Sequence, residues 1–190
     1  MKVKLCGHAT LAAAHTLFSS GLVDTNVIEF VTISGRSISP VLHLQNGEAQ
    51  DEFYIELDFP VDPVTEFRFD ESASQLSGAL NGASIIDLKR TQIRDDLLVV
   101  VTSGKAVSEL QPKLDAIVKC PERGARDLTS IFDSSFFCPK FGINEDPVCG
   151  SAHCALASYW SKKLGKCDFN AYQASPRGGV LNIHLDEQIQ

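Results

Sequence analysis

The sequence predicts an α+β fold in which a curved sheet is wrapped around a central helix, and it predicts that this arrangement occurs twice. Segments with the pattern of β-strands outnumber those with the pattern of helices. Two helical segments carry no charged residue, and a helix without a polar face is normally buried. These two segments also resemble each other, which indicates two similar halves.

The internal repeat is visible when residues 6–18, CGHATLAAAHTLF, are aligned with residues 149–161, CGSAHCALASYWS. The two segments share the Cys-Gly pair, the next alanine (Ala9 and Ala152) and a run of small apolar residues. Between them, Pro60 and Pro63 mark a boundary. The predicted domains are therefore residues 1–62, with the first central helix, and residues 63–190, with the second.

In the first half, the central helix is expected over residues 9–20, because Gly21 is typical of a position just after a helix. Apolar patterning predicts strands at 3–5, 22–33, 37–44 and 53–59. Asn46 and Gly47 predict a hairpin turn between the last two strands. This half is expected to be an incomplete barrel, which would leave part of its helix and its strand edges exposed.

In the second half, helices are expected at 72–80, within 107–117, and from 152 to a stop near Gly165. Strands are expected at 85–90, 96–101, 126–132, 170–175 and 180–185. The apolar run at 96–101 is expected to be buried. Arg177, Gly178 and Gly179 predict the turn between the last two strands.

The composition excludes several kinds of partner. The formal net charge is −7 and the pI is about 5.2, so the surface lacks the excess positive charge that nucleic acids and anionic membranes attract. The six cysteines form no CxxC pair, which argues against a metal site. The chain shows no signal peptide and no transmembrane run. We therefore expect a reduced, cytoplasmic protein.

Residues 144–153, NEDPVCGSAH, are the stretch best suited to a functional site. Acidic residues lead into a proline, and Cys149, Gly150 and Ser151 then open the uncharged helix. Ser151 is a candidate to cap this helix, to bind a ligand, or to do both, because a serine hydroxyl at a helix start can bind the first free amides. Those amides and the helix dipole favour a bound carboxylate or phosphate. Gly7 stands at the same place in the first repeat, so one such group of amides is expected in each half.

Four segments resemble the PhzF-like (phenazine biosynthesis-like) isomerase family, which shares the diaminopimelate epimerase fold. They are LCGHATLAAAH at 5–15, FVTISG at 30–35, GINEDPVCGSAHCALASYW at 142–160 and QASPRGG at 173–179. The resemblance implies two pseudo-symmetric halves, each a strongly curved, mostly antiparallel sheet around a central helix, with the active site between them. It also implies that the chain is truncated at both ends, and that the family's acid/base glutamate lies in a segment before the Cys-Gly-His motif.

The resemblance also implies roles for individual residues. His8, Asp146 and Ser151 occupy site positions of the family motifs. His8 is a candidate proton shuttle or hydrogen-bond donor, and Asp146 is a candidate either to orient the histidine or to take part in proton transfer. Gly7, Gly150 and Ser151 are assigned to substrate binding. Arg177 is a candidate for holding a second ligand oxygen, and a solvated turn arginine is an equally good interpretation of the residue alone.

Cys6 and Cys149 leave two interpretations open. In diaminopimelate epimerase and proline racemase, paired cysteines at equivalent helix starts act on the two faces of an α-carbon. PhzF-like members commonly carry threonine at the second position, so Cys149 restores the pair. The other interpretation is that Cys149 replaces threonine as a small buried group.

Three functions remain as hypotheses. The first is a cofactor-independent isomerase that moves a proton on a small carboxylate, in the form of a monomer or a homodimer. The second is a two-cysteine amino-acid racemase or epimerase that uses Cys6 and Cys149. The third is a non-catalytic ligand-binding or interaction protein that lacks the family glutamate.

Overall fold

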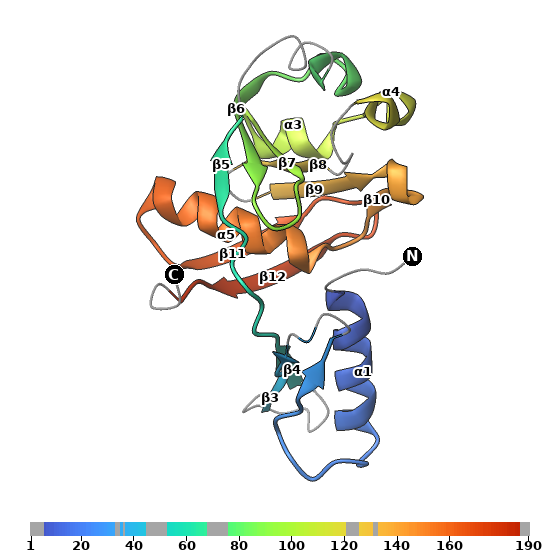
Figure 1. The fold of residues 1–190 in the computed structure, drawn as a ribbon, viewed down its shortest axis with the longest axis vertical. Coiled ribbons are helices and arrows are strands. Elements are labelled where there is room, and N and C mark those ends of the chain that lie inside the picture. Colours follow the sequence, from blue (N-terminus) through green and yellow to red (C-terminus); the bar gives the residue numbers. More distant parts are fainter. Residues whose placement is uncertain are drawn as a thin grey trace. The chain divides into compact units, whose positions relative to one another are not determined.

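A computed structural model of the chain describes residues 6–32, 35, 37–44, 53–67, 76–120, 126–130 and 133–186. The contacts within the chain divide it into two compact units, Met1–Pro60 and Val61–Gln190. The two units contain different elements (Figure 1).

The first unit contains one helix and two short sheets. Helix α1 spans Gly7–Ser19, close to the expected 9–20. Strands β1 and β2 pair antiparallel, as do β3 and β4. The four strands are β1 (Phe30–Val31), β2 (Ser37–Ile38), β3 (Val41–Leu44) and β4 (Phe53–Glu56). The hairpin turn expected at Asn46 and Gly47 lies outside the described residues.

The prediction of one long strand at 22–33 is wrong. Within the described residues 22–32, only Phe30–Val31 forms a strand, and Val27 adds a single bridge to Val41. The hydroxyl of Thr25 accepts a hydrogen bond from the Val27 amide at 3.2 Å, so a local turn takes the place of strand pairing. Likewise, the strand expected at 37–44 is divided into β2 and β3 by Pro40, which has no amide hydrogen for a strand ladder.

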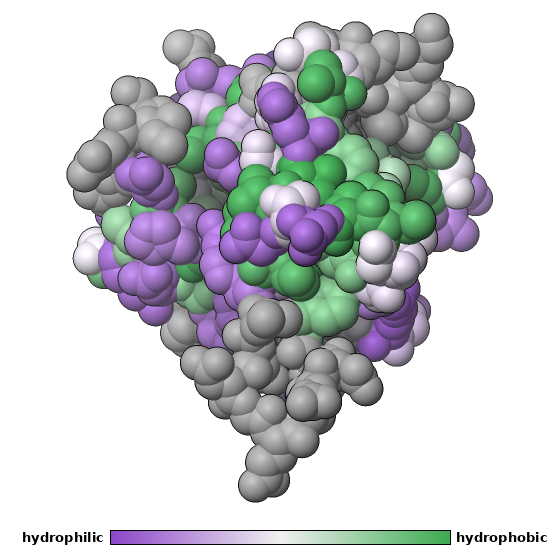
Figure 2. Space-filling model, turned by 90° about the horizontal axis from the view of Figure 1, so that it is seen from below, coloured by the Kyte–Doolittle hydropathy of each residue, from purple (hydrophilic) through white to green (hydrophobic). Residues whose placement is uncertain are grey.

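Apolar surface of the first unit is exposed, as expected from the sequence. Of the side chains of α1, only Ala14 is buried, while Leu11 is 43% exposed. Strand β4 contacts the helix, with the His15 and Phe53 rings stacked at 5.2 Å. Further exposed apolar side chains in this unit are Leu22, Val27, Val31 and Tyr54. In the view of Figure 2, apolar residues, coloured green, gather near the middle of the face shown.

The second unit is built on an eight-stranded sheet in the order β12-β11-β9-β8-β7-β6-β5, with β10 also pairing with β9. Most pairs are antiparallel, and β7–β8 and β9–β11 are parallel. The sheet therefore confirms the mostly antiparallel α+β architecture. The strands are β5 (Val64–Glu66), β6 (Ile85–Thr91), β7 (Leu97–Val101), β8 (Arg126–Thr129), β9 (Asp133–Cys138), β10 (Ile143–Asp146), β11 (Asp168–Gln173) and β12 (Gly179–His184).

Helix α5, Gly150–Leu164, is the central helix of this unit, and eight of its side chains are buried. It ends at Gly165, whose left-handed backbone (φ 64°) is the kind of conformation that glycine adopts easily. The helix expected within 107–117 is instead divided into α3 (Gly104–Ser108) and α4 (Leu114–Lys119). Pro112 lies between them and interrupts the helical pattern. Residues 76–79 are helical, whereas 72–75 lie outside the described residues.

Strand β7 connects two hydrophobic layers. All five of its side chains are buried, which confirms the prediction for this segment. Leu97, Val99 and Val101 pack with residues of α3 and α4 on one face of the sheet. Leu98 and Val100 pack on the other face against Ala155, Leu156 and Tyr159 of α5. The alternation of a strand thus places α5 against one face and the shorter helices against the other.

Candidate functional site

Helix α5 begins at Gly150, directly after Cys149. Cys149 is the N-cap residue, with an extended backbone (φ −106°, ψ 94°) and no side-chain capping bond. The expectation that Ser151 caps the helix is therefore wrong. Ser151 is already helical, and its Oγ lies 3.4 Å from Cys149 Sγ. Cys149 occupies the N-cap position because Gln173, at the end of β11, and Ser175 bind the backbone of the extended loop that leads to it.

Helix α1 begins in the same way. Cys6 is its N-cap residue, again extended (φ −137°, ψ 99°) and without a side-chain capping bond. In each helix the carbonyl of the cysteine binds the amide of the residue four positions later, Thr10 or His153, at 3.2 and 3.4 Å. The side chains of these same two residues also donate to that carbonyl, at 3.0 and 2.8 Å. The sequence repeat is thus also a repeat of the two helix starts.

The start of α5 offers free backbone donors. The Cys149 amide is bound by Gln173, but no acceptor for the amide of Gly150 or Ser151 occurs among the residues that the structure describes. Free amides at the start of a 15-residue helix point along its dipole and favour a negatively charged ligand. Asp146 is the last residue of β10, and its Oδ1 accepts a hydrogen bond from the Val148 amide at 3.2 Å.

The loop of residues 146–149 is held by two side chains, Gln173 at the end of β11 and Ser175 just after it. Gln173 is 1% exposed; its Oε1 accepts from the Cys149 amide and its Nε2 donates to the Asp146 carbonyl, each at 2.6 Å. Ser175 Oγ donates to the Pro147 carbonyl at 2.7 Å and accepts from the Gly178 amide at 3.0 Å. Sequence reasoning assigned neither residue a role. The available signal was a glutamine at an inward-facing position of a strand, where an unpaired polar group would be costly.

The turn after Ser175 lies close to this loop and requires its glycines. A Cβ on Gly179 would come within 2.3 Å of Val148 Cγ2. Gly178 has a φ of 69°, and a Cβ there would come within 2.4 Å of the Tyr172 hydroxyl. The glycines therefore allow the turn to pack against the loop. Arg177 lies in this turn with its side chain exposed.

The structure places the sequence-predicted residues in two groups. Asp146, Cys149, Gly150 and Ser151 lie together at the start of α5 in the second unit. Cys6, Gly7 and His8 lie at the start of α1 in the first unit, where His8 is exposed. A Cβ on Gly7 would lie 3.3 Å from the Phe59 ring, so a larger residue there would require the ring to move. Glu145 points away from the first group and accepts from Ser135 Oγ at 2.5 Å.

His153 is a buried, neutral part of the site's support. Its Nδ1 donates to the Cys149 carbonyl, so its Nε2 is left to accept from Ser134 Oγ at 3.2 Å. Burial lowers the pKa of His153, and the positive charge of Arg94 lowers it further, against the opposing effect of the Cys149 carbonyl. Ser134 is buried, although serine is usually a surface residue. Its hydrogen bond to His153 gives the buried hydroxyl a partner.

We expect this histidine to make the second unit less stable in mild acid. Its folded-state pKa lies below the ordinary value of 6.5, so below pH 6.5 the unfolded chain binds a proton that the folded unit does not. Above pH 6.5, the titration of His153 should not change the free energy of unfolding. Below this pH, stability should fall as the pH falls, and the slope due to this one group can be at most about 1.4 kcal/mol per pH unit.

Urea unfolding between pH 8 and pH 5 measures this effect. Trp160 is the single tryptophan of the chain and lies on α5, so its fluorescence reports on the second unit. In His153→Gln the acid slope should decrease by the contribution of one titrating group. An unchanged slope in that variant would contradict the assignment to His153.

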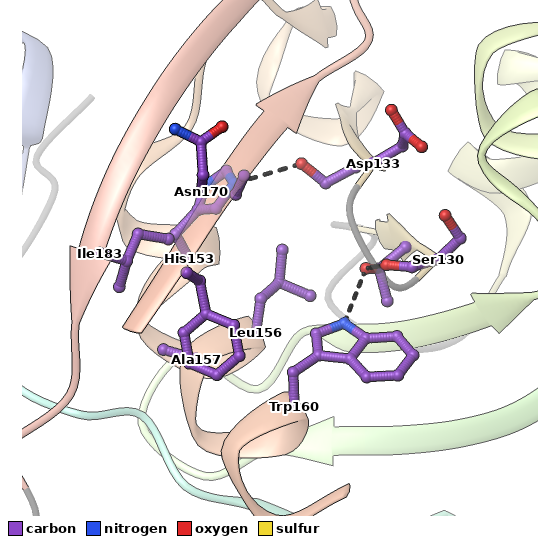
Figure 3. A pocket seen from close by; sticks show the side chains of 12 residues that line it. Ser130, Asp133, His153, Leu156, Ala157, Trp160, Asn170 and Ile183 are labelled. Carbon is purple, nitrogen blue, oxygen red and sulfur yellow. Dashed lines mark hydrogen bonds between the residues drawn. The ribbon is translucent and has the colours of Figure 1, made fainter. Parts of the chain in front are cut away.

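Two cavities of the second unit lie away from the start of α5. The smaller, about 20 Å³, is bounded by α5, the β11–β12 pair and the segment before β9. Figure 3 shows its labelled residues, among them His153 and Trp160, with Trp160 Nε1 bonded to Thr129 Oγ1 at 3.1 Å. The larger, about 440 Å³, is lined in part by Asp87, Tyr159 and Lys163. Neither is lined by residues 146–151.

The described residues contain no group of three or more His, Cys, Asp or Glu side chains placed to hold a metal ion. All six cysteines fall within the described ranges, and none forms a disulfide. No helix in the described part of the chain is long and apolar enough to cross a membrane.

Comparisons with known proteins all lead to one family. A model of the phenazine biosynthesis-like (PhzC-PhzF) family matches residues 1–190. An uncharacterized isomerase of Pseudomonas aeruginosa is 40% identical, with 98% of this chain and 67% of that protein covered. An uncharacterized isomerase of Halalkalibacterium halodurans is 38% identical, with coverages of 97% and 67%. Among solved structures, a PhzF-family protein of Enterococcus faecalis has a TM-score of 0.82 at 32% identity, with the same coverages of 97% and 67%.

Proposed function

Since this chain belongs to the phenazine biosynthesis-like (PhzC-PhzF) family, we propose that it is an isomerase that moves a proton on a small carboxylate without a cofactor. The observation that carries the proposal is the start of α5, where the amides of Gly150 and Ser151 have no acceptor among the described residues and where Asp146, at the end of β10, precedes them by a short loop. This arrangement combines donors for an anion with a carboxylate suited to proton transfer.

Within this proposal, the positions at the start of α5 support the roles of Asp146, Gly150 and Ser151, and the family motifs support those of His8, Gly7 and Arg177. The Gly150 and Ser151 amides bind the substrate carboxylate, whose charge the helix dipole stabilises. They also stabilise the negative charge that develops when a proton leaves carbon. Asp146 and His8 act in proton transfer, and Gly7 and Arg177 assist in substrate binding. The repeat of the helix starts supports a contribution from the α1 end, where Cys6 corresponds to Cys149.

A two-cysteine racemase is the second candidate, because Cys6 and Cys149 occupy the same N-cap position with similar backbone angles. In that mechanism one thiolate removes the α-hydrogen and the other thiol returns a proton to the opposite face. In the isomerase mechanism Cys149 is a small buried group, which its 5% exposure also fits.

Deuterium exchange separates the two candidates. The protein is incubated in D₂O with two panels, free L-amino acids and β,γ-unsaturated carboxylic acids, and the products are analysed by mass spectrometry and NMR. We expect deuterium incorporation and double-bond migration in a member of the unsaturated panel. Cys149→Thr should leave that rate within a few-fold of the wild type, because threonine preserves the small side chain and its position.

Three other results would overturn the isomerase proposal. If α-hydrogen exchange of an amino acid occurs and is abolished in Cys149→Thr, the racemase mechanism is correct. If a panel member binds in calorimetry without any exchange, the protein is a ligand-binding protein. If neither binding nor exchange occurs with either panel, the start of α5 is not a carboxylate site.

A further inference from the structure

The carboxamide of Gln173 connects the two ends of the loop that carries the proposed site. Its oxygen binds the amide of Cys149, where α5 begins, and its nitrogen binds the carbonyl of Asp146, where β10 ends. Because an amide hydrogen can only donate and a carbonyl can only accept, the orientation of the carboxamide is fixed. Both contacts are 2.6 Å long, and the side chain is almost fully buried.

We infer that Gln173 is a positioning residue that holds Asp146 and the start of α5 in a fixed relation. This inference rests on the proposed function, since it concerns the same site. Gln173 acts through the backbone of the loop and touches no reacting atom. The Asp146 carboxylate follows the loop because its Oδ1 is bonded to the Val148 amide. Moving the loop therefore moves the carboxylate relative to the Gly150 and Ser151 amides.

Because Gln173 is buried, water cannot readily replace its two hydrogen bonds to the loop. Without the carboxamide, the Cys149 amide and the Asp146 carbonyl would lose a buried partner, and a buried polar group without a partner is unfavourable. The loop would recover these bonds by opening toward water. Opening would expose Cys149, whose side chain is 5% exposed in the folded unit. The reactivity of the Cys149 thiol therefore reports on the position of the loop whether or not a substrate is known.

The test compares Gln173→Met, which keeps the shape but removes both bonds, with Gln173→Glu, which keeps only an acceptor for the Cys149 amide. Asn170→Asp is the matched control, because it makes the same amide-to-acid change on β11 at an exposed position, where Asn170 bonds Asn182 at 2.8 Å. Each protein is alkylated with iodoacetamide under native conditions, and tandem mass spectrometry assigns the modified cysteines. Cys154, on the same helix, is the internal reference.

We expect alkylation of Cys149 to accelerate about ten- to a hundredfold in Gln173→Met and less in Gln173→Glu, as for the loss of one or two buried hydrogen bonds. The rate at Cys154 should not change, and Asn170→Asp should match the wild type. Equal acceleration at Cys149 and Cys154 would overturn the inference, because it would mean general loosening of α5. No acceleration at Cys149 would also overturn it. If Gln173→Met does not fold by Trp160 fluorescence, Gln173→Glu decides.

Activity provides the second readout. On the carboxylate identified by deuterium exchange, Gln173→Glu should lower kcat at least tenfold with KM changed less than threefold, because it misplaces Asp146 more than it weakens the helix amides. An unchanged kcat would contradict a positioning role even if the alkylation result holds. If the wild type exchanges no carboxylate, the proposed function fails, while the alkylation experiment still tests the connection made by Gln173.

Discussion

Replacing Asp146 with asparagine is expected to lower kcat about 100- to 10,000-fold, the range for removal of a positioned proton-transfer group. The substitution removes the basic carboxylate but retains an oxygen that can accept from the Val148 amide, the bond observed at 3.2 Å. The loop should therefore keep its conformation, and the loss should come from chemistry. The measurement is the rate of deuterium exchange on the identified carboxylate, together with KM, which should change little.

Glu145→Gln is the matched control for this prediction. Glu145 precedes Asp146 on β10, but its Oε1 accepts from Ser135 Oγ on β9, and the glutamine oxygen can accept the same bond. We expect its kcat to stay within threefold of the wild type. Similar losses in Asp146→Asn and Glu145→Gln would show that the charge of β10 matters rather than the position of Asp146. Full activity in Asp146→Asn would remove this residue from the mechanism.

Replacing Leu98 with alanine is expected to lower the free energy of unfolding of the second unit by about 2–5 kcal/mol. Leu98 is 0% exposed and packs against Ala155, Leu156 and Tyr159, which seat α5 on the sheet. Alanine would leave a cavity in a layer where the backbone of β7 is held by strands on both sides, so the site cannot easily collapse. Urea unfolding followed by Trp160 fluorescence measures the change.

Val180→Ala is the control, since Val180 is 63% exposed on β12 and should cost less than about 1 kcal/mol. A loss in Leu98→Ala no larger than in Val180→Ala would mean that the contact between β7 and α5 does not stabilise the unit. Leu98 packs below α5 and does not belong to the loop of residues 146–149. The activity of Leu98→Ala should therefore fall only near the unfolding midpoint, where part of the protein is unfolded.

The features that the sequence predicted correctly are those encoded by local patterns. The two central helices, the strands predicted at 85–90 and 96–101 and observed at 85–91 and 97–101, and the final hairpin have apolar patterns or glycine signals within a short stretch. The repeat of Cys-Gly before each helix also identified the two helix starts, which share their backbone conformation. The family motifs are equally local, which is why the resemblance could be read from four segments.

Strands β9 and β10 were not predicted because their sequences do not have the composition of a strand. In β9, Ser134 and Ser135 occupy consecutive buried positions, which would be unfavourable without partners. Their partners are His153, on α5, and Glu145, on β10. These side chains come from other elements, so only the assembled unit makes the serines compatible with a buried strand.

The sequence by itself determined the α+β architecture, the two helix starts and the residue types of the candidate site, because each depends on neighbours along the chain. The tertiary structure alone decided that Cys149, and not Ser151, occupies the N-cap position of α5, and that Gln173 and Ser175 hold the loop before it. The physical reason is the distance along the chain. Gln173 is separated from Cys149 by the whole of α5 and by β11, and a hydrogen bond over that separation leaves no local pattern in the sequence.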